Sequence, residues 1–358
     1  MHHLLDLKEA IKTEASHLGF THIGVAPALP VPHYDDFTNW VEAGFHADMD
    51  YLARPDTLSK RADPGLILPG CQRVISLAMP YFPPQAGMME TPPGQGRVAA
   101  YALSRDYHNI IWDMLGQLET FIQTHSSKKA RLKSYVDTGP ILERSFAAQA
   151  GIGIPGKNSC LIIPGMGSYI FLAAVLTDLA LPADSPFTRD LCGSCQRCMD
   201  ACPTSCILPN RTIDAGRCIS YLTIENKDII PNQLKPHIGN WFFGCDICQM
   251  VCPHNKHTPN TAQTPDQPNR LGEPVLTEFI NLIEVLTWDQ ETLSNAFNGT
   301  ALTRAKRRGL LRNAAVVLGN QGCRDALPGL QSLRDHETDP VIQDACHWAI
   351  DKIQAVKG

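Results

Sequence analysis

The chain contains 358 residues, of which 44% are hydrophobic, and it carries a formal net charge of -5. This length favours two or three domains, and the acidic balance excludes a globally basic nucleic-acid-binding protein, although it is compatible with a local basic patch. No apolar run approaches the roughly eighteen residues that a transmembrane helix requires, so we expect no membrane contact and a cytoplasmic location.

The first half of the chain alternates between helical and strand-like patterns. Apolar residues at helical spacing predict helices over 4–19, 107–124 and 141–151. Short apolar runs predict strands over 20–27, 73–81, 132–138, 160–164 and 168–177. We therefore expect an α+β multidomain protein, with a mixed α/β domain over 1–182, a cysteine-rich region over 183–262 and a helical region over 263–358.

The densest polar segment of the first domain is YVDTGPILER, which begins at Tyr135. Asp137 ends an apolar strand, a Thr-Gly turn follows, and Pro140 is expected to begin the next helix. Ligands of α/β folds bind beyond the carboxyl ends of the strands, which would place the Asp137 carboxyl in a binding site. On the motif alone, however, such an aspartate is more often a helix N-cap, so both roles stay open here.

A glycine-spaced loop, GIGIPGKNSCLIIPGMGS, begins at Gly151. Its backbone amides could approach a polar cofactor closely, but its spacing matches neither a P-loop nor the dinucleotide-binding fingerprint. ATP and NAD are therefore disfavoured. The loop indicates a large cofactor of another kind, which these residues do not name.

Cysteines dominate the region after the first domain. The run CGSCQRCMDACP, from Cys192 to Cys202, has the spacing of a loop that wraps a [4Fe-4S] cluster through three sulfurs and sends its fourth sulfur to a second cluster. A shorter run, GCDICQMVCP, follows downstream, and Cys218 lies between the two. Because the last cysteine of a run crosses to the other cluster, we assign one cluster to Cys192, Cys195, Cys198 and Cys252, and the other to Cys202, Cys218, Cys245 and Cys248.

Disulfide bonds and a zinc site are the alternatives for these cysteines. The first residues do not resemble a secretory signal peptide, and a chain this long can bury a core without covalent cross-links, so disulfides are not expected. Zinc prefers two C-x2-C pairs separated by a longer loop, which this spacing does not provide. The remaining cysteines are expected to be buried apolar residues: Cys71, Cys160, Cys206, Cys323 and Cys346.

The last part of the chain has helical periodicity over 309–322 and 338–353, after a polar, proline-rich linker over 257–274. Helix pairs whose apolar faces need neighbours are typical of α-solenoids. The segment TRAKRRGLLRN, from Thr303, has five cations and no acid. It is expected either to bind the phosphates of a nucleic acid or to form a solvated helix face.

Several segments, in this order, resemble the epoxyqueuosine reductases: YVDTGPILERSFAAQAGIGIPGKNS, CGSCQRCMDACPT, CISYLTIE, GCDICQMVCPHN and RAKRRGLLRNA. The resemblance covers nearly the whole chain. It implies the last step in making the tRNA wobble nucleoside queuosine, the reduction of epoxyqueuosine. It also implies a nitroreductase-like cobalamin-binding α/β domain, a ferredoxin-like module with two [4Fe-4S] clusters and a C-terminal HEAT-like domain that binds tRNA. An external low-potential electron donor would feed the clusters, and one tRNA per pocket suggests a monomer.

The resemblance also implies roles for individual residues. Asp137 would be the general acid that protonates the opening epoxide oxygen, provided that burial raises its pKa enough to keep it protonated near neutral pH. Contacts with cobalamin would come from Arg61, Tyr107, His108, Asn158, Ser159, Leu161 and Ser220. Contacts with the tRNA backbone would come from Lys306, Arg307, Arg308 and Arg312. The modified base would be extruded into the α/β pocket, and we expect no histidine on the cobalt.

One residue departs from this resemblance, because a small residue such as Ala or Gly is expected where this chain has Cys206. The main alternative function is a cobalamin-dependent reductase of another substrate, like a reductive dehalogenase, but such an enzyme does not need the basic helical segment. An electron-transfer ferredoxin would need neither the first domain nor the helices. A non-enzymatic tRNA-binding protein would leave the eight cysteines without a role.

Overall fold

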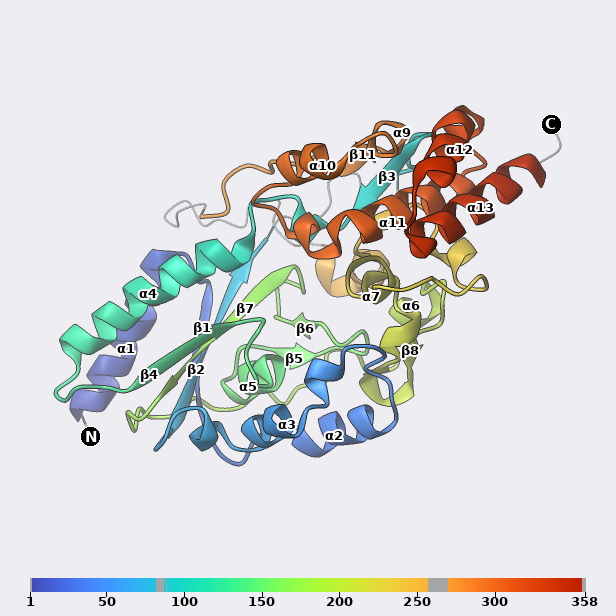
Figure 1. Ribbon diagram of the computed structural model, residues 1–358. Coiled ribbons are helices and arrows are strands. Elements are labelled where there is room, and N and C mark those ends of the chain that lie inside the picture. Colours follow the sequence, from blue (N-terminus) through green and yellow to red (C-terminus); the bar gives the residue numbers. More distant parts are fainter. Residues whose placement is uncertain (1, 82–86, 88, 257–269, 356–358) are drawn as a thin grey trace.

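The first domain is built around a four-stranded sheet (Figure 1). The computed structural model describes residues 2–81, 87, 89–256 and 270–355. The strands lie in the order β1 (His22–Pro27), β2 (Arg73–Pro80), β7 (Ile170–Thr177) and β4 (Leu132–Val136), and they match four of the five expected apolar runs. Every neighbouring pair is antiparallel, so the rule for the carboxyl ends of parallel strands does not explain the position of Asp137.

Helices cover both faces of this sheet. Helices α1 (His2–Leu18) and α4 (Tyr107–His125) lie side by side on one face (Figure 1), where their apolar residues share a core with β1, β2 and β7. Helix α5 (Glu143–Gln149) packs on the other face with a second core. Because α5 begins after an N-cap at Leu142, the expectations that Pro140 begins this helix and that Asp137 caps it are both wrong.

Between β1 and β2 the chain forms two helices that the sequence patterns did not reveal, α2 (Tyr34–Glu42) and α3 (Pro55–Ala62). Helix α2 has no buried residue, and α3 buries only Thr57 and Arg61, so neither contributes a buried apolar side chain to the core. Figure 1 shows the two helices next to each other along the lower edge of the view.

The cysteine-rich region contains short elements joined by loops. Strands β8 (Ile207–Leu208) and β9 (Thr212–Ile213) form a hairpin, and the helices are α6 (Arg197–Asp200), α7 (Ile219–Ile224) and α8 (Ile247–Met250). A second hairpin, of β5 (Ile154–Pro155) and β6 (Leu161–Ile162), belongs to the first domain. Helices α6 and α8 lie within the two cysteine runs and pack against each other, which brings the runs together.

A second sheet links the three predicted domains. Its strands are β10 (Trp241–Phe243), β3 (Gln95–Val98) and β11 (Phe279–Asn281), with β3 parallel to β10 and antiparallel to β11. One continuous core contains residues from 98–103, 215–243 and 282–353. The cysteine-rich and helical regions therefore do not have separate cores. The predicted domain boundary at 262/263 and most of the expected linker lie outside the described residues.

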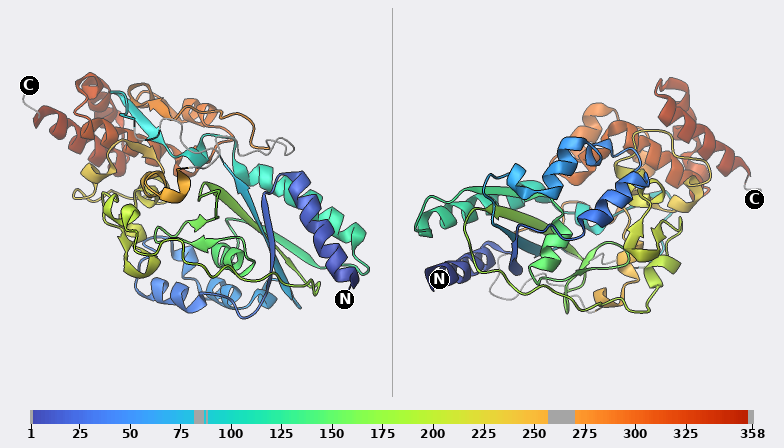
Figure 2. Two further views of the ribbon diagram at one scale, coloured as in Figure 1. Left: turned by 180° about the vertical axis from the view of Figure 1, so that it is seen from behind. Right: turned by 90° about the horizontal axis from the view of Figure 1, so that it is seen from below.

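The C-terminal region consists of α9 (Leu282–Val285), α10 (Gln290–Ala296), α11 (Lys306–Asn320), α12 (Leu327–His336) and α13 (Pro340–Ala355). Helices α11 and α13 confirm the two expected helices. They pack closely at Gly319, where an added Cβ would lie 2.8 Å from the Ala349 Cα. The termini lie at opposite ends of the molecule (Figures 1 and 2). In the part of the chain that the structure describes, no helix combines the length and apolar character needed to cross a bilayer.

Candidate functional site

A cavity of about 730 Å³ opens beside the end of β4. Its wall combines the turn after β4, helix α3, the short helix η1 (Asp50–Leu52) and the short helix η8 (Ala301–Ala305) from the C-terminal region. Asp137, Arg61, Tyr51 and Arg304 line it. Because ligand pockets typically measure about 300–1,000 Å³, this cavity has room for a large ligand.

The turn after β4 aims Asp137 into this cavity. Asp137 has a backbone φ of 56°, in the left-handed region that non-glycine residues rarely adopt. The Thr138 N–H donates to the Val136 carbonyl at 2.6 Å, which closes a tight turn, and a Cβ on Gly139 would lie 2.4 Å from the Tyr135 ring. Backbone strain of this kind costs about 1–3 kcal/mol and is concentrated at functional sites.

Two aromatic residues at the start of α4 hold the Asp137 carboxylate. The Tyr107 hydroxyl donates to Asp137 Oδ2 at 3.0 Å, and His108 Nε2 lies 3.6 Å from the same oxygen. Desolvation would raise the pKa of the Asp137 carboxyl, but its contacts with His108 and Tyr107 outweigh desolvation and leave the pKa below its ordinary value. The expectation that burial keeps Asp137 protonated is therefore wrong.

The neighbouring groups hold protons instead. Burial alone would lower the pKa of His108, but the Asp137 and Asp106 carboxylates outweigh it and raise the pKa above its ordinary value. Asp106 also fixes the ring, because its Oδ1 lies 2.8 Å from His108 Nδ1. Burial and the charge of Asp137 raise the pKa of Tyr107, whose ring stacks on Phe171 at 4.1 Å between centroids. At neutral pH, Asp137 is thus a carboxylate between two side chains whose pKa values are raised.

Glu143 is a further site residue that the sequence analysis did not single out. Its Oε1 accepts a hydrogen bond from the Asp137 backbone N–H at 2.9 Å, across the turn. Burial, followed by the charge of Asp137, raises the pKa of Glu143 to about 8. Glu143 lies in the GPILER segment, but only the folded turn shows that it contacts Asp137.

Arg61 has the character of a ligand-binding residue. It lines the cavity from α3, is 7% exposed, and has a buried Nη1 without a hydrogen-bond partner. A buried donor of this kind is costly unless a bound group satisfies it. The guanidinium also lies over the Phe37 ring, 5.1 Å from its centroid. Arg61 and the cavity volume fit a large polar cofactor with anionic or carbonyl oxygens.

None of the other residues assigned to cobalamin lines the cavity. Two of them, Tyr107 and His108, lie beside it because they contact Asp137. Asn158 is 4% exposed and donates to the Cys248 carbonyl at 3.5 Å, and Ser159 donates to the Arg211 carbonyl at 3.1 Å. Leu161 is buried in the core beside α5, and Ser220 lies half-buried in α7. In this structure the side chains of Asn158 and Ser159 connect the glycine-spaced loop to the cysteine-rich region.

The cysteines of the first tetrad are close enough to interact electrostatically; Cys252 is buried and the other three are half-buried. Burial raises the pKa of Cys198 and of Cys252, and electrostatic repulsion from Cys192 adds to both shifts, with Cys195 also acting on Cys252. The loop between these cysteines is held by Lys157, whose Nζ donates to the carbonyls of residues 193 and 195 at 2.9 and 2.8 Å. We call this group the outer tetrad, because residues 193, 194, 196 and 197 around it are exposed.

The second tetrad, here called the inner tetrad, comprises Cys202, Cys218, Cys245 and Cys248. Burial raises the pKa of Cys245, and repulsion from Cys218 and Cys202 adds to the shift. The Cys248 thiol interacts with Cys160, which raises the pKa of Cys248, so Cys160 is not the isolated apolar residue expected. The Cys206 thiol is 3% exposed and lies 3.4 Å from the Cys202 sulfur.

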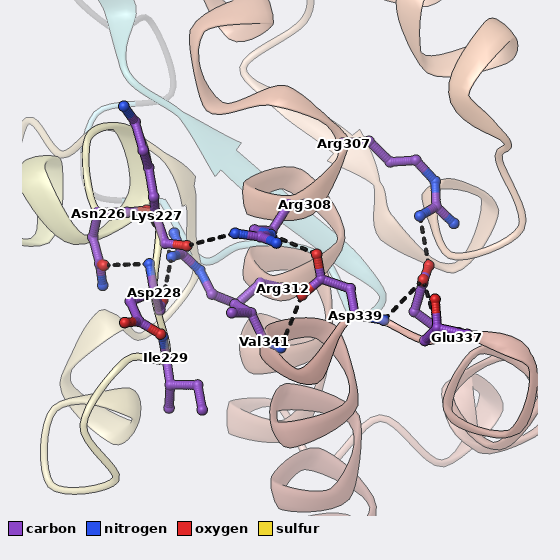
Figure 3. Close-up of polar contacts among 11 residues, drawn as sticks. Asn226, Lys227, Asp228, Ile229, Arg307, Arg308, Arg312, Glu337, Asp339 and Val341 are labelled. Carbon is purple, nitrogen blue, oxygen red and sulfur yellow. Dashed lines mark hydrogen bonds and ion pairs between the residues drawn. The ribbon is translucent and has the colours of Figure 1, made fainter.

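The basic segment lies at the junction of α11 with the cysteine-rich region (Figure 3). Arg307 and Arg308 form ion pairs with Glu337 and Asp339, each at 2.5 Å. Lys306 is exposed at the start of α11. Arg304, which lines the cavity, pairs with Glu225 at 2.5 Å. Three of these cations therefore have acidic partners, and Arg304 connects this surface with Asp137's cavity.

Arg312 differs from the others. It is 1% exposed, and its guanidinium donates to the backbone carbonyls of Leu222 at 2.6 Å, Asn226 at 2.8 Å and Asp228 at 2.9 Å. Burial lowers its pKa to about 10, so it stays charged at neutral pH. Because it is enclosed, the expectation that Arg312 binds a phosphate is wrong, and it instead holds the chain after α7 against α11 (Figure 3).

Comparisons with known proteins agree with this arrangement. Residues 191–255 match a family described as 4Fe-4S double cluster binding domain, and residues 61–138 match one described as Epoxyqueuosine reductase QueG, DUF1730. The first match contains all eight assigned cysteines and confirms iron-sulfur clusters rather than zinc or disulfides.

Similarity to individual proteins extends over nearly the whole chain. The epoxyqueuosine reductase of Pseudomonas aeruginosa is 38% identical over 348 residues, which cover 96% of this chain and 94% of that protein. A crystal structure of an epoxyqueuosine reductase with a tRNA-Tyr epoxyqueuosine-modified stem loop has a TM-score of 0.85 and 30% identity, covering 98% of this chain and 91% of that one. A structure of the Bacillus subtilis epoxyqueuosine reductase, with its catalytic aspartate loop swung out of the active site, has the same TM-score, identity and coverage.

Proposed function

This chain belongs to the epoxyqueuosine reductase family, and we propose that it reduces epoxyqueuosine to queuosine at the wobble position of a tRNA. The reaction consumes two electrons and two protons, removes the epoxide oxygen as water and leaves an alkene. The observation that carries the proposal is the position of Asp137, which is strained, hydrogen-bonded to Tyr107 and directed into a cavity that the C-terminal region helps to form.

We further propose that the three parts of the chain are a nitroreductase-like domain, a ferredoxin-like module and a HEAT-like helical region. The eight cysteines match the donor set of two [4Fe-4S] clusters. The unpartnered Arg61 Nη1 and the cavity volume support cobalamin as the large cofactor. When bound, cobalamin supplies a low-potential reductant for the epoxide. Arg61 would hold a polar group of this cofactor, and Asn158 and Ser159 would keep the glycine-spaced loop beside the inner tetrad.

The side chains around Asp137 would handle the protons. As the epoxide opens, its oxygen gains negative charge and draws a proton from the nearest donor. Asp137 would pass on a proton that it receives from His108 or Tyr107, since both lie within 3.6 Å of its Oδ2 and the pKa of each is raised above its ordinary value. His108 would stay engaged by Asp106 and Asp137 and would not bind cobalt.

Glu143 would keep Asp137 in place. In the Bacillus subtilis relative, the catalytic aspartate loop can swing out of the active site. In this chain Asp137 is strained at φ 56°, and the hydrogen bond from its N–H to Glu143 opposes release of the turn. We propose that Glu143 stabilises the inward conformation of the turn.

The tRNA stem loop would lie over the basic segment, with its modified base in the cavity. Lys306, Arg307 and Arg308 would contact the backbone phosphates, and phosphates would compete with Glu337 and Asp339 for the two arginines. Arg304 is close enough to the cavity to contact the extruded nucleotide. A tRNA substrate favours a cytoplasmic protein, and one tRNA in the cavity beside Asp137 favours a monomer.

Electrons would enter through the outer tetrad from an external low-potential donor. The exposed residues around its loop leave this tetrad accessible, whereas Asn158 of the glycine-spaced loop contacts the Cys248 carbonyl of the inner tetrad. This difference in accessibility supports the order outer tetrad, inner tetrad, cofactor.

Anaerobic turnover of epoxyqueuosine-containing tRNA by the cluster-loaded protein tests the proposed function. Mass spectrometry of the released nucleosides should show loss of one oxygen only when cobalamin is supplied. Protein that binds cobalamin and tRNA but leaves the nucleoside unchanged would reject this function and favour another reductive cobalamin substrate.

A further inference from the structure

The inner tetrad contains a fifth thiol that the eight-cysteine assignment does not use. Cys206 lies four residues after Cys202, and its sulfur is 3.4 Å from the Cys202 sulfur. Cys206 therefore contacts one of the four proposed ligands of one cluster.

The backbone fixes the position of this thiol. The Cys206 carbonyl accepts a hydrogen bond from the Asp214 N–H at 2.9 Å, and Ile207, the next residue, pairs with Ile213 in the β8–β9 hairpin. With only 3% exposure, Cys206 cannot turn its side chain into solvent. Its sulfur is thus held beside Cys202 rather than reaching it by chance rotation.

A second donor acts on the same sulfur. The Thr204 hydroxyl lies 3.5 Å from the Cys202 sulfur, and Thr204 is 2% exposed. Cys202 is consequently flanked by one hydroxyl and one thiol, both buried. The Cys202 sulfur thus has two buried side chains within 3.5 Å that can donate a hydrogen bond to it.

A fifth ligand is not needed at this position, because a [4Fe-4S] cluster takes four cysteine thiolates and the inner tetrad already supplies them. A protonated thiol that is not a ligand can still donate a weak hydrogen bond to a ligand sulfur. Hydrogen bonds to the cysteine sulfurs are among the factors that set a cluster's reduction potential. They stabilise the more negatively charged reduced cluster, so each one raises the potential.

We propose that Cys206 is a positioning residue of the inner cluster, which donates an S–H hydrogen bond to the Cys202 sulfur and raises the reduction potential of that cluster. The inference rests on the two-cluster assignment of the proposed function. It would make electron transfer from the outer to the inner cluster more favourable than in a chain with alanine at this position.

The test is a redox titration of the cluster-loaded protein followed by electron paramagnetic resonance. Cys206→Ala should retain the full iron content and shift the midpoint potential of one cluster to a more negative value, while the other cluster stays unchanged. Cys206→Ser should remain close to the parent protein, because its hydroxyl replaces the lost donor. Cys346→Ala, which removes a buried thiol from α13, should change neither potential.

Cys202→Ala identifies the affected cluster, because it removes a proposed ligand of the inner cluster. It should alter or remove the signal of the inner cluster, the one that shifts in Cys206→Ala. Loss of iron from Cys206→Ala would show that Cys206 is a ligand and would overturn the proposal. Unchanged potentials in Cys206→Ala would overturn it as well. Failure of the parent protein to convert epoxyqueuosine would reject the proposed function without altering these potentials.

Discussion

Replacing Arg312 tests the finding that this residue supports the fold and does not bind tRNA. Arg312→Met keeps much of the side-chain length but removes the donors to three backbone carbonyls. A buried acceptor left unsatisfied costs about 1–3 kcal/mol, and Arg312→Met leaves three such carbonyls without this donor. We therefore expect Arg312→Met to lower the free energy of unfolding by about 3 kcal/mol or more.

Arg308→Met is the matched control, since Arg308 lies one helical turn earlier in α11 and its side chain is 50% exposed. Exposed ion pairs contribute about 0–1 kcal/mol, so this variant should keep its stability and lose affinity for tRNA, most clearly at low salt. Urea unfolding of anaerobically prepared protein and filter binding of the tRNA stem loop measure the two effects. An Arg312→Met protein that unfolds within about 1 kcal/mol of the parent but no longer binds tRNA would refute the structural role.

Three further predictions concern the groups around Asp137. Glu143→Ala should lower kcat about tenfold or more, because the Asp137 N–H loses its acceptor. Glu143→Gln keeps an acceptor and should retain most of the activity. Equal losses of kcat in both variants would point to a proton-transfer role for Glu143 instead. Tyr107→Phe removes a donor to Asp137 and should lower kcat by about 10–100-fold with little change in KM, and an unchanged rate would remove Tyr107 from the proton path. Between pH 3.8 and pH 6.5, the ordinary pKa values of Asp137 and His108, the contact between these two groups should stabilise the fold fully. The stabilisation should be lost as the pH rises through the raised pKa of His108, and also as it falls through the lowered pKa of Asp137. The difference in unfolding free energy between the parent protein and His108→Gln should therefore be largest between these two pH values and shrink below and above them, and a difference that does not vary with pH would contradict the contact.

The elements that sequence reasoning found are those with strong local patterns. Helices α1, α4 and α13 carry apolar residues at helical spacing, and strands β2 and β7 are apolar along nearly their whole length because helices cover the sheet. The cysteine runs were equally informative, because the spacing of cluster ligands is fixed by the geometry of one loop.

Features that depend on distant segments could not be found in this way. Strand β3 pairs with strands more than 100 residues away, and the wall of Asp137's cavity includes Arg304. Neither contact leaves a local pattern. The pKa of Asp137 was expected to be raised, because the sequence shows neither the Tyr107 hydroxyl nor His108 beside the carboxylate.

Arg308 and Arg312 illustrate the same limit within one helix. They lie four residues apart and have the same charge, so the sequence assigned both to phosphate binding. Packing separates them, because the segment after α7 encloses Arg312 and presents backbone carbonyls to it, while Arg308 stays half exposed. Charge clusters predict a basic surface only for those members that the fold leaves accessible.

The most direct test of the proposed function compares the parent protein with Asp137→Ala under anaerobic conditions, both carrying two clusters and supplied with cobalamin and a strong chemical reductant. The parent protein should convert epoxyqueuosine in the tRNA stem loop to a nucleoside lighter by one oxygen. Asp137→Ala should retain its clusters and its affinity for the stem loop but convert the substrate about 10²–10⁴-fold more slowly, the usual contribution of a positioned proton donor. Conversion by Asp137→Ala at the parental rate would contradict the role of this carboxylate and, with it, the assignment of the cavity as the active site.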